Sequence, residues 1–304
     1  MIERFPISVI IVSWNTRALT LAAIDSVFRQ NDPDVEVIVI DNASGDDSVS
    51  QIQRCFPQVR LIVNDRNRGF AAANNIGMHA AKGELFLLLN SDAELISPRL
   101  FDVVRGKFAG RPDIAAIGGK LIFPSGRVQA MGRTFLSLKS VIKEQLLFAS
   151  MCPQNAGRRR HPLVVDYIDG AFMAVRRQVF EKIGGFDERY FMFAEDMEWC
   201  RRMKNSGWKI VVLPELVIRH YHGAAAKLHF RRMLFHCLVS SCRFISQFEN
   251  DSRAKSVYDI FLIGFLLRIM LSLMRGNGLA MEYCRALIEG LTMRPQLKRL
   301  LTED

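Results

Sequence analysis

A wholly apolar run that ends in a carboxylate constrains this chain more than any other feature. Residues 85–89 are all Leu or Phe, and Asn90-Ser91-Asp92 follows at once. A run without polar alternation is typical of a strand buried on both faces, as in a parallel sheet covered by helices. In open α/β sheets, ligands bind outside the carboxyl ends of the strands. Asp92 is therefore expected either at a ligand site or in a turn that caps the next element.

The same pattern recurs through the first half of the chain. Apolar runs at residues 7–13, 35–41, 59–64 and 84–89 predict four strands, and the second of them also ends in an aspartate, Asp41. Helices are predicted near residues 18–30 and 70–81, and turn and helix-capping residues follow Asp41. Strands that alternate with helices form βαβ units and a parallel sheet, so the sequence predicts an α/β fold.

Short polar motifs follow these strand ends and continue into the second half. They are Ser13-Trp14-Asn15, Asp41-Asn42-Ala43-Ser44, Asn67-Arg68-Gly69-Phe70, Asn74-Asn75-Ile76-Gly77, Asn90-Ser91-Asp92, Asp169-Gly170-Ala171-Phe172-Met173, Gly184-Gly185-Phe186-Asp187-Glu188, Phe191-Met192-Phe193-Ala194-Glu195-Asp196 and His220. In this order they resemble the inverting family 2 glycosyltransferases with a GT-A fold, and most closely the bacterial rhamnosyltransferase-like enzymes of cell-surface polysaccharide assembly. The resemblance implies a Rossmann-like GT-A domain at residues 1–226, with a mostly parallel sheet flanked by helices. A helical segment at residues 227–304 lies outside the resemblance.

The resemblance also implies that a nucleotide-sugar donor binds at the strand ends. The residues expected to contact it are Ser13, Asn15, Asp41, Asn42, Arg68, Gly69, Asn74, Asn90, Ser91, Asp169 and Gly170. Asp41 can accept a hydrogen bond from a base N–H or a ribose hydroxyl, and its alternative role is to cap a helix. Gly69 permits an unusual backbone φ. Arg68 is expected either to approach phosphate or base, or to be a solvated surface arginine.

A divalent cation is expected beside the donor. Breaking the bond between a sugar and its diphosphate leaves negative charge on the diphosphate, which a metal ion can neutralise. Mg²⁺ and Mn²⁺ take oxygen ligands and often only one or two protein carboxylates, which suits Asp92. The resemblance implies that His220 joins Asp92 at the cation; the alternative is a solvated or capping histidine. The family motif usually begins with an acidic residue where this chain has Asn90, so the neutral Asn90 is expected beside the metal ligands or against the donor sugar.

An inverting transfer also needs a base that takes the proton of the acceptor hydroxyl. Residues 194–205 predict a helix with Glu195 and Asp196 in its first turn, where the helix dipole favours an ionised carboxylate. We predict Asp196 as this base, with Glu195 as the second candidate catalytic residue. In the alternative, both acids only stabilise the start of the helix.

Composition sets the outer limits. A net charge of +10 suggests an anionic partner such as a nucleotide, a lipid phosphate or a membrane surface. Nucleic acid is not expected, because the sequence carries no RNP, zinc-finger or helix-turn-helix signature. The six cysteines form no Cys-x-x-Cys pair, which favours a reduced, cytoplasmic location. The first predicted strand starts almost at once, so no signal peptide is expected.

The chain beyond residue 227 is apolar and basic, with helical character. Residues 260–274 are nearly all apolar apart from Arg268, and fifteen residues are short for a membrane span, which needs about twenty. An interfacial helix pair fits better, with a packed appendage or an interface in a homo-oligomer as alternatives. We therefore predict a peripheral protein on the cytoplasmic face of the cell membrane, bound to an anionic surface. Residues 133–165, which contain Arg158-Arg159-Arg160, predict a loop that is either mobile beside the acceptor site or simply solvated.

Together these features predict transfer of one sugar, with inversion, from dTDP-rhamnose or another dTDP- or UDP-sugar to a lipid-linked or polysaccharide acceptor. One alternative is a sugar nucleotidyltransferase, although such enzymes carry a Gly-rich basic loop after the first strand, where this chain has residues 13–17 without glycine. A second alternative is a non-catalytic nucleotide-binding protein at the membrane surface, which the neutral Asn90 leaves open.

Overall fold

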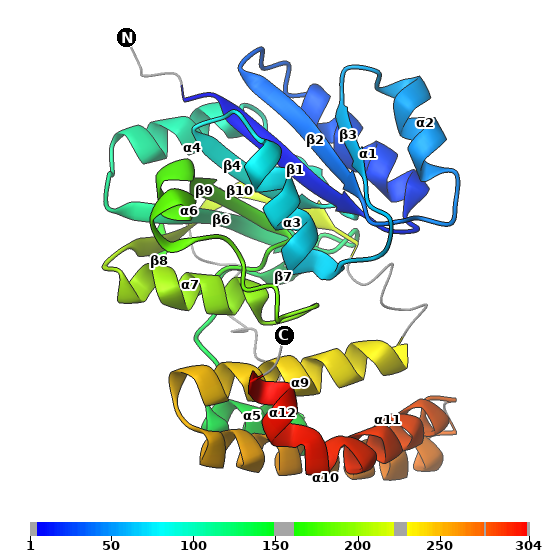
Figure 1. Ribbon diagram of the computed structural model, residues 1–304. Helices are drawn as coiled ribbons and strands as arrows, with labels where there is room; N and C mark the ends of the chain where they lie inside the picture. The colour runs from blue at the N-terminus through cyan, green and yellow to red at the C-terminus, as the bar shows by residue number, and fades with distance from the viewer. Residues whose placement is uncertain (1–4, 149–160, 222–229, 277, 303–304) are drawn as a thin grey trace. The chain divides into compact units, whose positions relative to one another are not determined.

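The computed structural model describes residues 5–148, 161–221, 230–276 and 278–302, and these form two compact units (Figure 1). The first unit comprises Met1–Thr134, Cys152–Asp187 and Asp196–Ala225. The second comprises Phe135–Met151, Glu188–Glu195 and Ala226–Asp304. The second unit thus combines the C-terminal helices with two pieces of chain from within the first 226 residues.

A single mixed sheet forms the centre of the first unit. Its strand order is β3-β2-β1-β4-β9-β6-β10-β5, with β7 paired to β6 and β8 paired to β10. The strands are β1 (Ile7–Ser13), β2 (Val35–Asp41), β3 (Arg60–Val63), β4 (Leu85–Asn90), β5 (Ala93–Leu95), β6 (Ile114–Ile122), β7 (Val128–Ala130), β8 (Leu163–Val164), β9 (Phe172–Arg176) and β10 (Lys209–His220). The first four strands in this order run parallel, so β1, β2 and β4 end at one edge of the sheet.

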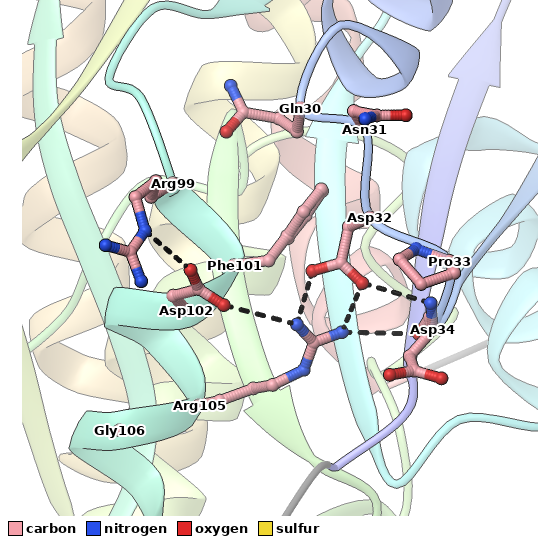
Figure 2. A pocket seen from close by; sticks show the side chains of 10 residues that line it. All are labelled: Gln30, Asn31, Asp32, Pro33, Asp34, Arg99, Phe101, Asp102, Arg105 and Gly106. Carbon is pink, nitrogen blue, oxygen red and sulfur yellow. Dashed lines mark hydrogen bonds and ion pairs between the residues drawn. The ribbon is translucent and has the colours of Figure 1, made fainter.

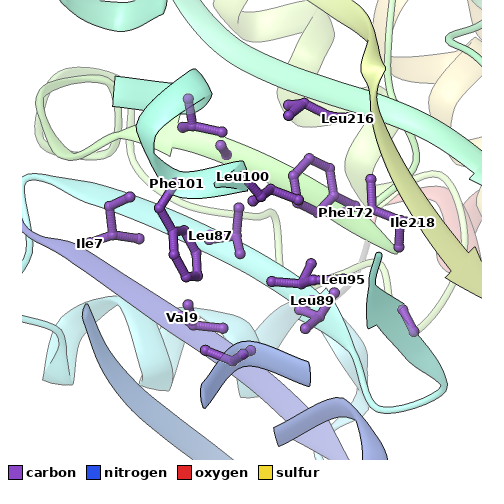
Figure 3. Close-up of a cluster of buried hydrophobic side chains, with 14 of the residues drawn as sticks. Ile7, Val9, Leu87, Leu89, Leu95, Leu100, Phe101, Phe172, Leu216 and Ile218 are labelled. Atoms are coloured by element: carbon purple, nitrogen blue, oxygen red, sulfur yellow. The ribbon is translucent and has the colours of Figure 1, made fainter. Parts of the chain in front are cut away.

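Helices cover both faces of this sheet. They are α1 (Arg17–Phe28), α2 (Ser48–Cys55), α3 (Gly69–Ala80), α4 (Leu100–Ala109), α6 (Arg177–Ile183) and α7 (Glu195–Asn205). Alternate residues of β1 and β4, such as Val9 and Leu87, pack with Leu100 and Phe101 of α4 in a fully buried cluster (Figure 3). On the other face, α3 comes so close that a Cβ at Gly77 would lie 2.4 Å from a side-chain carbon of Ile10. Burial on both faces explains why these strands lack polar alternation.

The strand β9 runs against its neighbours. It lies antiparallel to β4 on one side and to β6 on the other, with Leu89 opposite Phe172 and Ala116 opposite Val175. Because β9 is reversed, the residues that precede it reach the same edge of the sheet as the carboxyl end of β4. The backbone N–H of Asn90 donates to the carbonyl of Ala171 at 3.1 Å, which joins the two segments.

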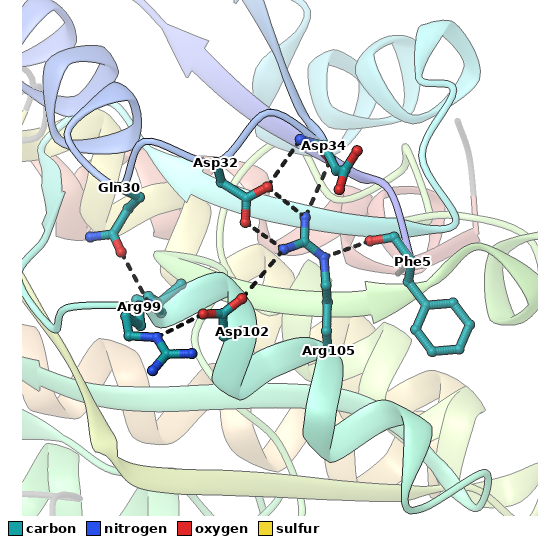
Figure 4. Close-up of polar contacts among 8 residues, drawn as sticks. Phe5, Gln30, Asp32, Asp34, Arg99, Asp102 and Arg105 are labelled. Atoms are coloured by element: carbon teal, nitrogen blue, oxygen red, sulfur yellow. Dashed lines mark hydrogen bonds and ion pairs between the residues drawn. The ribbon is translucent and has the colours of Figure 1, made fainter. Parts of the chain in front are cut away.

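Arg105 of α4 contacts the segments that precede β1 and β2 at the amino ends of these strands (Figure 4). Its guanidinium makes a two-pronged ion pair with Asp32, and its Nε donates to the carbonyl of Phe5 at 2.8 Å. A further hydrogen bond reaches the carbonyl of Asp34 at 3.4 Å. One buried side chain therefore holds the segment before β1, the segment before β2 and α4.

The second unit is helical. Its helices are α5 (Leu138–Leu146), α9 (Phe230–Phe248), α10 (Asp251–Met274), α11 (Ala280–Met293) and α12 (Leu297–Thr302), with a short 3-10 turn η2 (Arg294–Gln296) before the last. The Tyr258 hydroxyl donates to the Gly290 carbonyl at 2.6 Å, which joins α10 to α11. Arg268 donates to the carbonyls of Glu144 and Gln145, which joins α10 to α5.

One helix of this unit is longer than the apolar run that the sequence shows, and one expectation was wrong. The apolar run at residues 260–274 is part of α10, which begins at Asp251 and is 24 residues long. In the described part of the chain it is the one helix long and apolar enough to cross a membrane, although partly buried core helices meet the same criterion. Residues 138–146 of the expected loop form α5, with a capping box at Ser137 and Ser140. The arginines at 158–160 lie outside the described residues.

The α/β fold, the mostly parallel sheet flanked by helices and the C-terminal helical segment are confirmed.

Candidate active site

Asp92 and His220 meet at the carboxyl edge of the sheet. β5 follows Asp92 directly and pairs antiparallel with the end of β10, which sets His220 opposite Ala93. The His220 Nε2 atom then lies 3.2 Å from Asp92 Oδ1, and both side chains are nearly buried. Sheet pairing thus brings together the two residues predicted to bind a cation.

Gln129 of β7 fixes the orientation of this histidine. Its Oε1 atom lies 2.7 Å from His220 Nδ1. A carbonyl oxygen can only accept, so Nδ1 donates to Gln129 and Nε2 is the ring nitrogen that faces Asp92. Metal-binding histidines commonly have their second nitrogen held in this way. Asn90 completes the group, with its Nδ2 atom 3.4 Å from His220 Nε2.

The donor set here fits a hard divalent cation with few protein ligands. It supplies one carboxylate and one oriented imidazole, and no group of three or more His, Cys, Asp or Glu side chains is placed to hold a metal among the residues that the structure describes. Mg²⁺ and Mn²⁺ bound with substrate phosphates often take only one or two protein ligands.

Asp41, at the end of β2, is buried with one carboxylate oxygen unused. Its Oδ1 accepts from the backbone N–H of Ser44 at 2.8 Å, whereas its Oδ2 has no hydrogen-bond partner among the described residues. An unsatisfied buried acceptor costs free energy unless a ligand completes it. The Asp41 side chain therefore supports a turn through Oδ1 and leaves Oδ2 able to accept a further hydrogen bond.

Asn42 organises the turn at residues 64–69. Its Oδ1 accepts from Asn64 Nδ2 and from the Arg68 N–H, and its Nδ2 donates to Asn67 and to the Gly69 carbonyl. Gly69 has a φ of +84°, which a side chain would disfavour. The Arg68 guanidinium is half-exposed and forms an ion pair with Asp65 at the surface.

The loop after β1 is tied to the loop after β2. Asn15, at a φ of +52°, accepts from the Gly45 N–H through its Oδ1 at 2.7 Å and donates its own N–H to Ser44 Oγ at 2.9 Å. Ser91 Oγ accepts from Thr16 Oγ1 at 2.9 Å. The Ser13 hydroxyl is buried against Thr20, and Asn74 bonds within α3 to the Phe70 carbonyl. Ser13 and Asn74 thus face the interior, whereas Asn15 and Ser91 lie in the loops at the sheet edge.

Asp196 lies beside the segment that enters β9. It is the second residue of α7, after Glu195, as predicted; the Glu195 side chain is buried and Asp196 is half-buried. Its Oδ2 accepts from the Gly170 N–H at 3.0 Å and its Oδ1 from the Met197 N–H at 2.7 Å. Since Ala171 is bonded to Asn90, Gly170 links Asp196 to the end of β4.

Burial raises the pKa of Asp196 to about 6, and the charge of Asp169 adds to this. The N–H groups of Gly170 and Met197 and the charge of Arg133 lower the pKa by less. The expected influence of the helix dipole is therefore outweighed by desolvation. A carboxylate with a pKa near 6 is still ionised at neutral pH and accepts a proton more readily than an ordinary aspartate.

The chain reaches α7 through two strained residues. Phe193 and Ala194 have φ values of +68° and +63°, in a region that residues with a side chain rarely adopt. Such strain collects at functional sites, where the surrounding structure holds it in place.

The sequence did not single out Gln129, Thr16 or Arg133. Gln129 and Arg133 lie outside the recognised motifs, and their partners His220 and Asp169 are 91 and 36 residues away along the chain. The one local sequence signal beside Arg133 is the glycine that precedes it. Glycine favours a left-handed backbone, and Gly132 adopts one, with a φ of +77°.

A cavity of about 650 Å³ lies at the opposite end of the sheet (Figure 2). It is lined by Gln30, Asn31, Asp32, Pro33, Asp34, Arg99, Phe101, Asp102, Arg105 and Gly106. Arg105 pairs with Asp32, and Arg99 pairs with Asp102, so these charges satisfy one another. The residues of the predicted site are elsewhere, at the carboxyl edge.

The sequence model of glycosyl transferase family 2 matches residues 8–184, more than half of the chain. The chain belongs to this family. The matched residues run from β1 to α6 and include Asp41, Asp92 and Gly170.

Named relatives extend the match beyond the family 2 region. The O-antigen biosynthesis protein RfbC of Myxococcus xanthus is 27% identical over 73% of this chain, which corresponds to 18% of that protein. The N-acetylglucosaminyl-diphospho-decaprenol L-rhamnosyltransferase of Mycobacterium tuberculosis is 28% identical over 62% of this chain and 66% of its own length. The chain thus spans less than two thirds of either relative.

A solved structure confirms the GT-A fold predicted for this family 2 chain. The mannosyltransferase PcManGT of Pyrobaculum calidifontis, solved in complex with GDP-Man and Mn²⁺, has a TM-score of 0.56. The similarity covers 95% of this chain and 88% of that one at 17% sequence identity.

Proposed function

We propose that this protein transfers one sugar, with inversion, from a nucleotide-sugar donor to an acceptor hydroxyl. The meeting of Asp92 and His220, 3.2 Å apart at the carboxyl edge of the sheet, carries this proposal. Family membership supports this class of reaction, and the half-buried Asp196 would supply a base beside the same edge.

In the proposed reaction, Asp196 takes the proton of the acceptor hydroxyl. The acceptor oxygen forms the new bond to the anomeric carbon while the bond from that carbon to the diphosphate breaks, and the electron pair leaves with the nucleoside diphosphate. Direct displacement of this kind needs a single base and gives inversion. The Gly170 and Met197 N–H groups hold the Asp196 carboxylate in place.

Asp92 and His220 would hold a Mg²⁺ or Mn²⁺ ion. The cation would neutralise the charge that develops on the leaving diphosphate. The unused Oδ2 of Asp41 would accept from the base or ribose of the nucleotide, which would complete its hydrogen bonding.

The relatives support a role in cell-surface glycan synthesis. The names of the Myxococcus and Mycobacterium proteins refer to O-antigen and to rhamnosyl transfer onto a lipid-linked sugar. We propose dTDP-rhamnose, or another dTDP- or UDP-sugar, as the donor and a lipid-linked or polysaccharide acceptor.

A panel of nucleotide sugars tests this function. The full chain is mixed with UDP-, dTDP- and GDP-sugars, with Mn²⁺ or with EDTA, and thermal unfolding and release of nucleoside diphosphate are measured. A bound donor at about 100 times its Kd should stabilise the native state by about 2.7 kcal/mol. We expect one dTDP- or UDP-sugar to raise Tm in Mn²⁺ and to be cleaved only in the presence of the cation. No stabilisation by any sugar nucleotide would overturn the proposal, and stabilisation without cleavage would favour the non-catalytic alternative.

The outward face of α10 suggests where the protein would meet a membrane. Five large apolar side chains, between 48% and 81% exposed, recur at helical spacing: Ile263, Leu266, Met270, Leu273 and Met274. The opposite face of α10 is buried through Val257, Phe261 and Phe265. An apolar face on a chain of net charge +10 suits the surface of an anionic bilayer. We propose that this face rests on the cytoplasmic side of the cell membrane.

Vesicle sedimentation tests the proposed membrane face. The double variant Leu266→Glu, Met270→Glu should bind vesicles that contain phosphatidylserine about a hundredfold more weakly, because burial of each side chain contributes about 1.5–3 kcal/mol. Val63→Glu, at an exposed apolar position in the first unit, is the matched control and should bind normally. High salt should release the wild-type protein only in part, since salt screens charge but does not weaken apolar burial. Unchanged binding of the double variant, or a wild-type dimer that the double variant abolishes, would assign the face to another role.

A further inference from the structure

Arg133 forms an ion pair with Asp169, next to the proposed base. Its Nε atom lies 3.1 Å from Asp169 Oδ1 and 3.3 Å from Oδ2, and the two side chains are 26% and 24% exposed. Asp169 is adjacent to Gly170, whose N–H donates to Asp196. Arg133 is thus connected to the Asp196 carboxylate by its ion pair with Asp169, the Asp169–Gly170 peptide bond and the hydrogen bond from Gly170.

The backbone on both sides of this pair is fixed. The Arg133 N–H donates to the Tyr167 carbonyl at 2.9 Å, and the Arg133 carbonyl accepts from the N–H groups of Asp166 and Tyr167. Gly132 has a φ of +77°, and a Cβ there would lie 2.6 Å from Val165. Arg133 is therefore held in register with the segment that leads to Asp169.

Gly170 has little freedom to move. A Cβ on this residue would lie 3.0 Å from the Phe70 ring and 3.8 Å from the Asp196 Cβ. The turn at 169–170 therefore lies directly against both residues, and a shift in Asp169 would be transmitted to the hydrogen bond on Asp196.

We propose that Arg133 is a positioning residue for the base: its ion pair fixes the Asp169–Gly170 turn against Asp196 and offsets the negative charge of Asp169. This inference rests on the proposed function, in which Asp196 takes the acceptor proton. Nothing in the family match itself assigns a role to Arg133, which reaches Asp196 only through other residues.

The charges around Asp196 give the proposal a direction. Asp169 raises the pKa of Asp196, and Arg133 lowers it. In turn, Asp169 raises the pKa of Arg133, so the guanidinium is always charged. On α7 itself, Cys200 is one turn away and burial raises the pKa of its thiol, so it stays neutral; Glu195 precedes the base. Loss of Arg133 would therefore leave Asp169 uncompensated and raise the pKa of Asp196, whereas loss of the Asp169 charge would lower it.

The pH dependence of kcat at saturating donor tests this inference. In Arg133→Met, the acid limb of the pH profile, where kcat falls as the pH is lowered, should move up by about one pH unit. This is the lower end of the range for the loss of a nearby opposite charge. Asp169→Asn should move the same limb to lower pH, in the opposite direction. Arg133→Lys keeps the charge and should leave the limb close to its wild-type position. The double variant Arg133→Met, Asp169→Asn should return the limb toward wild type.

The outcomes separate this inference from the proposed function. If the wild-type protein has an acid limb that depends on Asp196, but Arg133→Met leaves it unmoved or lowers it, Arg133 has only a structural role. If Asp196→Asn keeps wild-type turnover, the base itself has been wrongly chosen. If Arg133→Met does not fold, Arg133→Lys and Asp169→Asn still test the inference. An acid limb that moves in the same direction and by the same amount in both variants would overturn it.

Discussion

The two ends of the parallel strands in the first unit differ in how their charged side chains are partnered. At the amino ends, Arg105 is paired with Asp32 and also satisfies two backbone carbonyls. At the carboxyl ends, Asp41 keeps a carboxylate oxygen without a partner in the described structure, and Asp196 has a pKa raised by burial.

We propose that this difference separates side chains that hold the fold from side chains that bind a ligand. Removing one member of a paired buried charge leaves the other uncompensated, which costs stability. A desolvated or unsatisfied carboxylate already costs stability in the free protein, and a ligand or a proton relieves that cost. Substitutions at the amino end should therefore change stability, and those at the carboxyl end should change activity.

The largest effect is expected from Asp92→Ala. A cation at a developing diphosphate charge contributes several kcal/mol, so turnover should fall about a thousandfold or more. Circular dichroism should stay close to wild type, because Asp92 lies in the turn between β4 and β5 and not in the apolar cluster that the sheet forms with α4. Asp47→Ala, an exposed carboxylate in the loop after β2, is the control and should keep its activity. Near-normal turnover of Asp92→Ala in Mg²⁺ would contradict the metal assignment.

Arg105→Met should have the next largest effect, and on stability alone. It removes the partner of Asp32 and leaves that carboxylate uncompensated, which should cost about 3 kcal/mol in the free energy of unfolding. Urea denaturation measures this loss. Arg99→Met, whose ion pair with Asp102 is exposed, is the matched control and should cost less than about 1 kcal/mol. A loss of kcat in folded Arg105→Met would show that the two ends are not independent.

Asp196→Asn should lower turnover about a hundredfold or more, the scale of general-base catalysis. Donor affinity should be retained, as measured by the Tm shift with nucleotide sugar. In the wild-type protein the rate should fall about tenfold for each pH unit below about 6, because protonation removes the base. The variant should lose this dependence. Greater damage from Glu195→Gln would identify Glu195 as the base instead.

Gln129→Ala should have the smallest effect of the four. It removes the oxygen that orients His220, so the affinity for Mn²⁺ should fall about 10- to 100-fold. Turnover should recover at high Mn²⁺ concentration, which distinguishes this variant from Asp92→Ala. An unchanged metal dependence in both Gln129→Ala and His220→Ala would remove the histidine from the metal site.

Local pattern was enough to predict the parts of the fold that are buried on both faces. β1, β2 and β4 begin and end within a residue of their expected positions, since their apolar runs stop where the sheet stops. The first residues of α7 were also predicted correctly. Short elements were harder, because the two residues of β8 and the antiparallel direction of β9 depend on partners far along the chain.

The candidate site was predictable only in part, for the same reason. Asp41 and Asp92 could be proposed from their positions at strand ends. The pairing of Asp92 with His220 needed a family resemblance, and Gln129 and Arg133 carried no motif at all. Their roles depend on contacts made by the folded sheet, such as the β5–β10 pairing that sets His220 beside Asp92.

The insertion of β9 between β4 and β6 also bears on how the protein is made. The ribosome delivers β4 and β6 long before β9, yet these two strands do not pair with each other. Until residue 176 has emerged, the apolar strands at 85–89 and 114–118 would each present an open edge, which invites pairing with other chains. We therefore expect the nascent protein to be most prone to such pairing during the stretch of synthesis in which β4 and β6 have emerged and β9 has not.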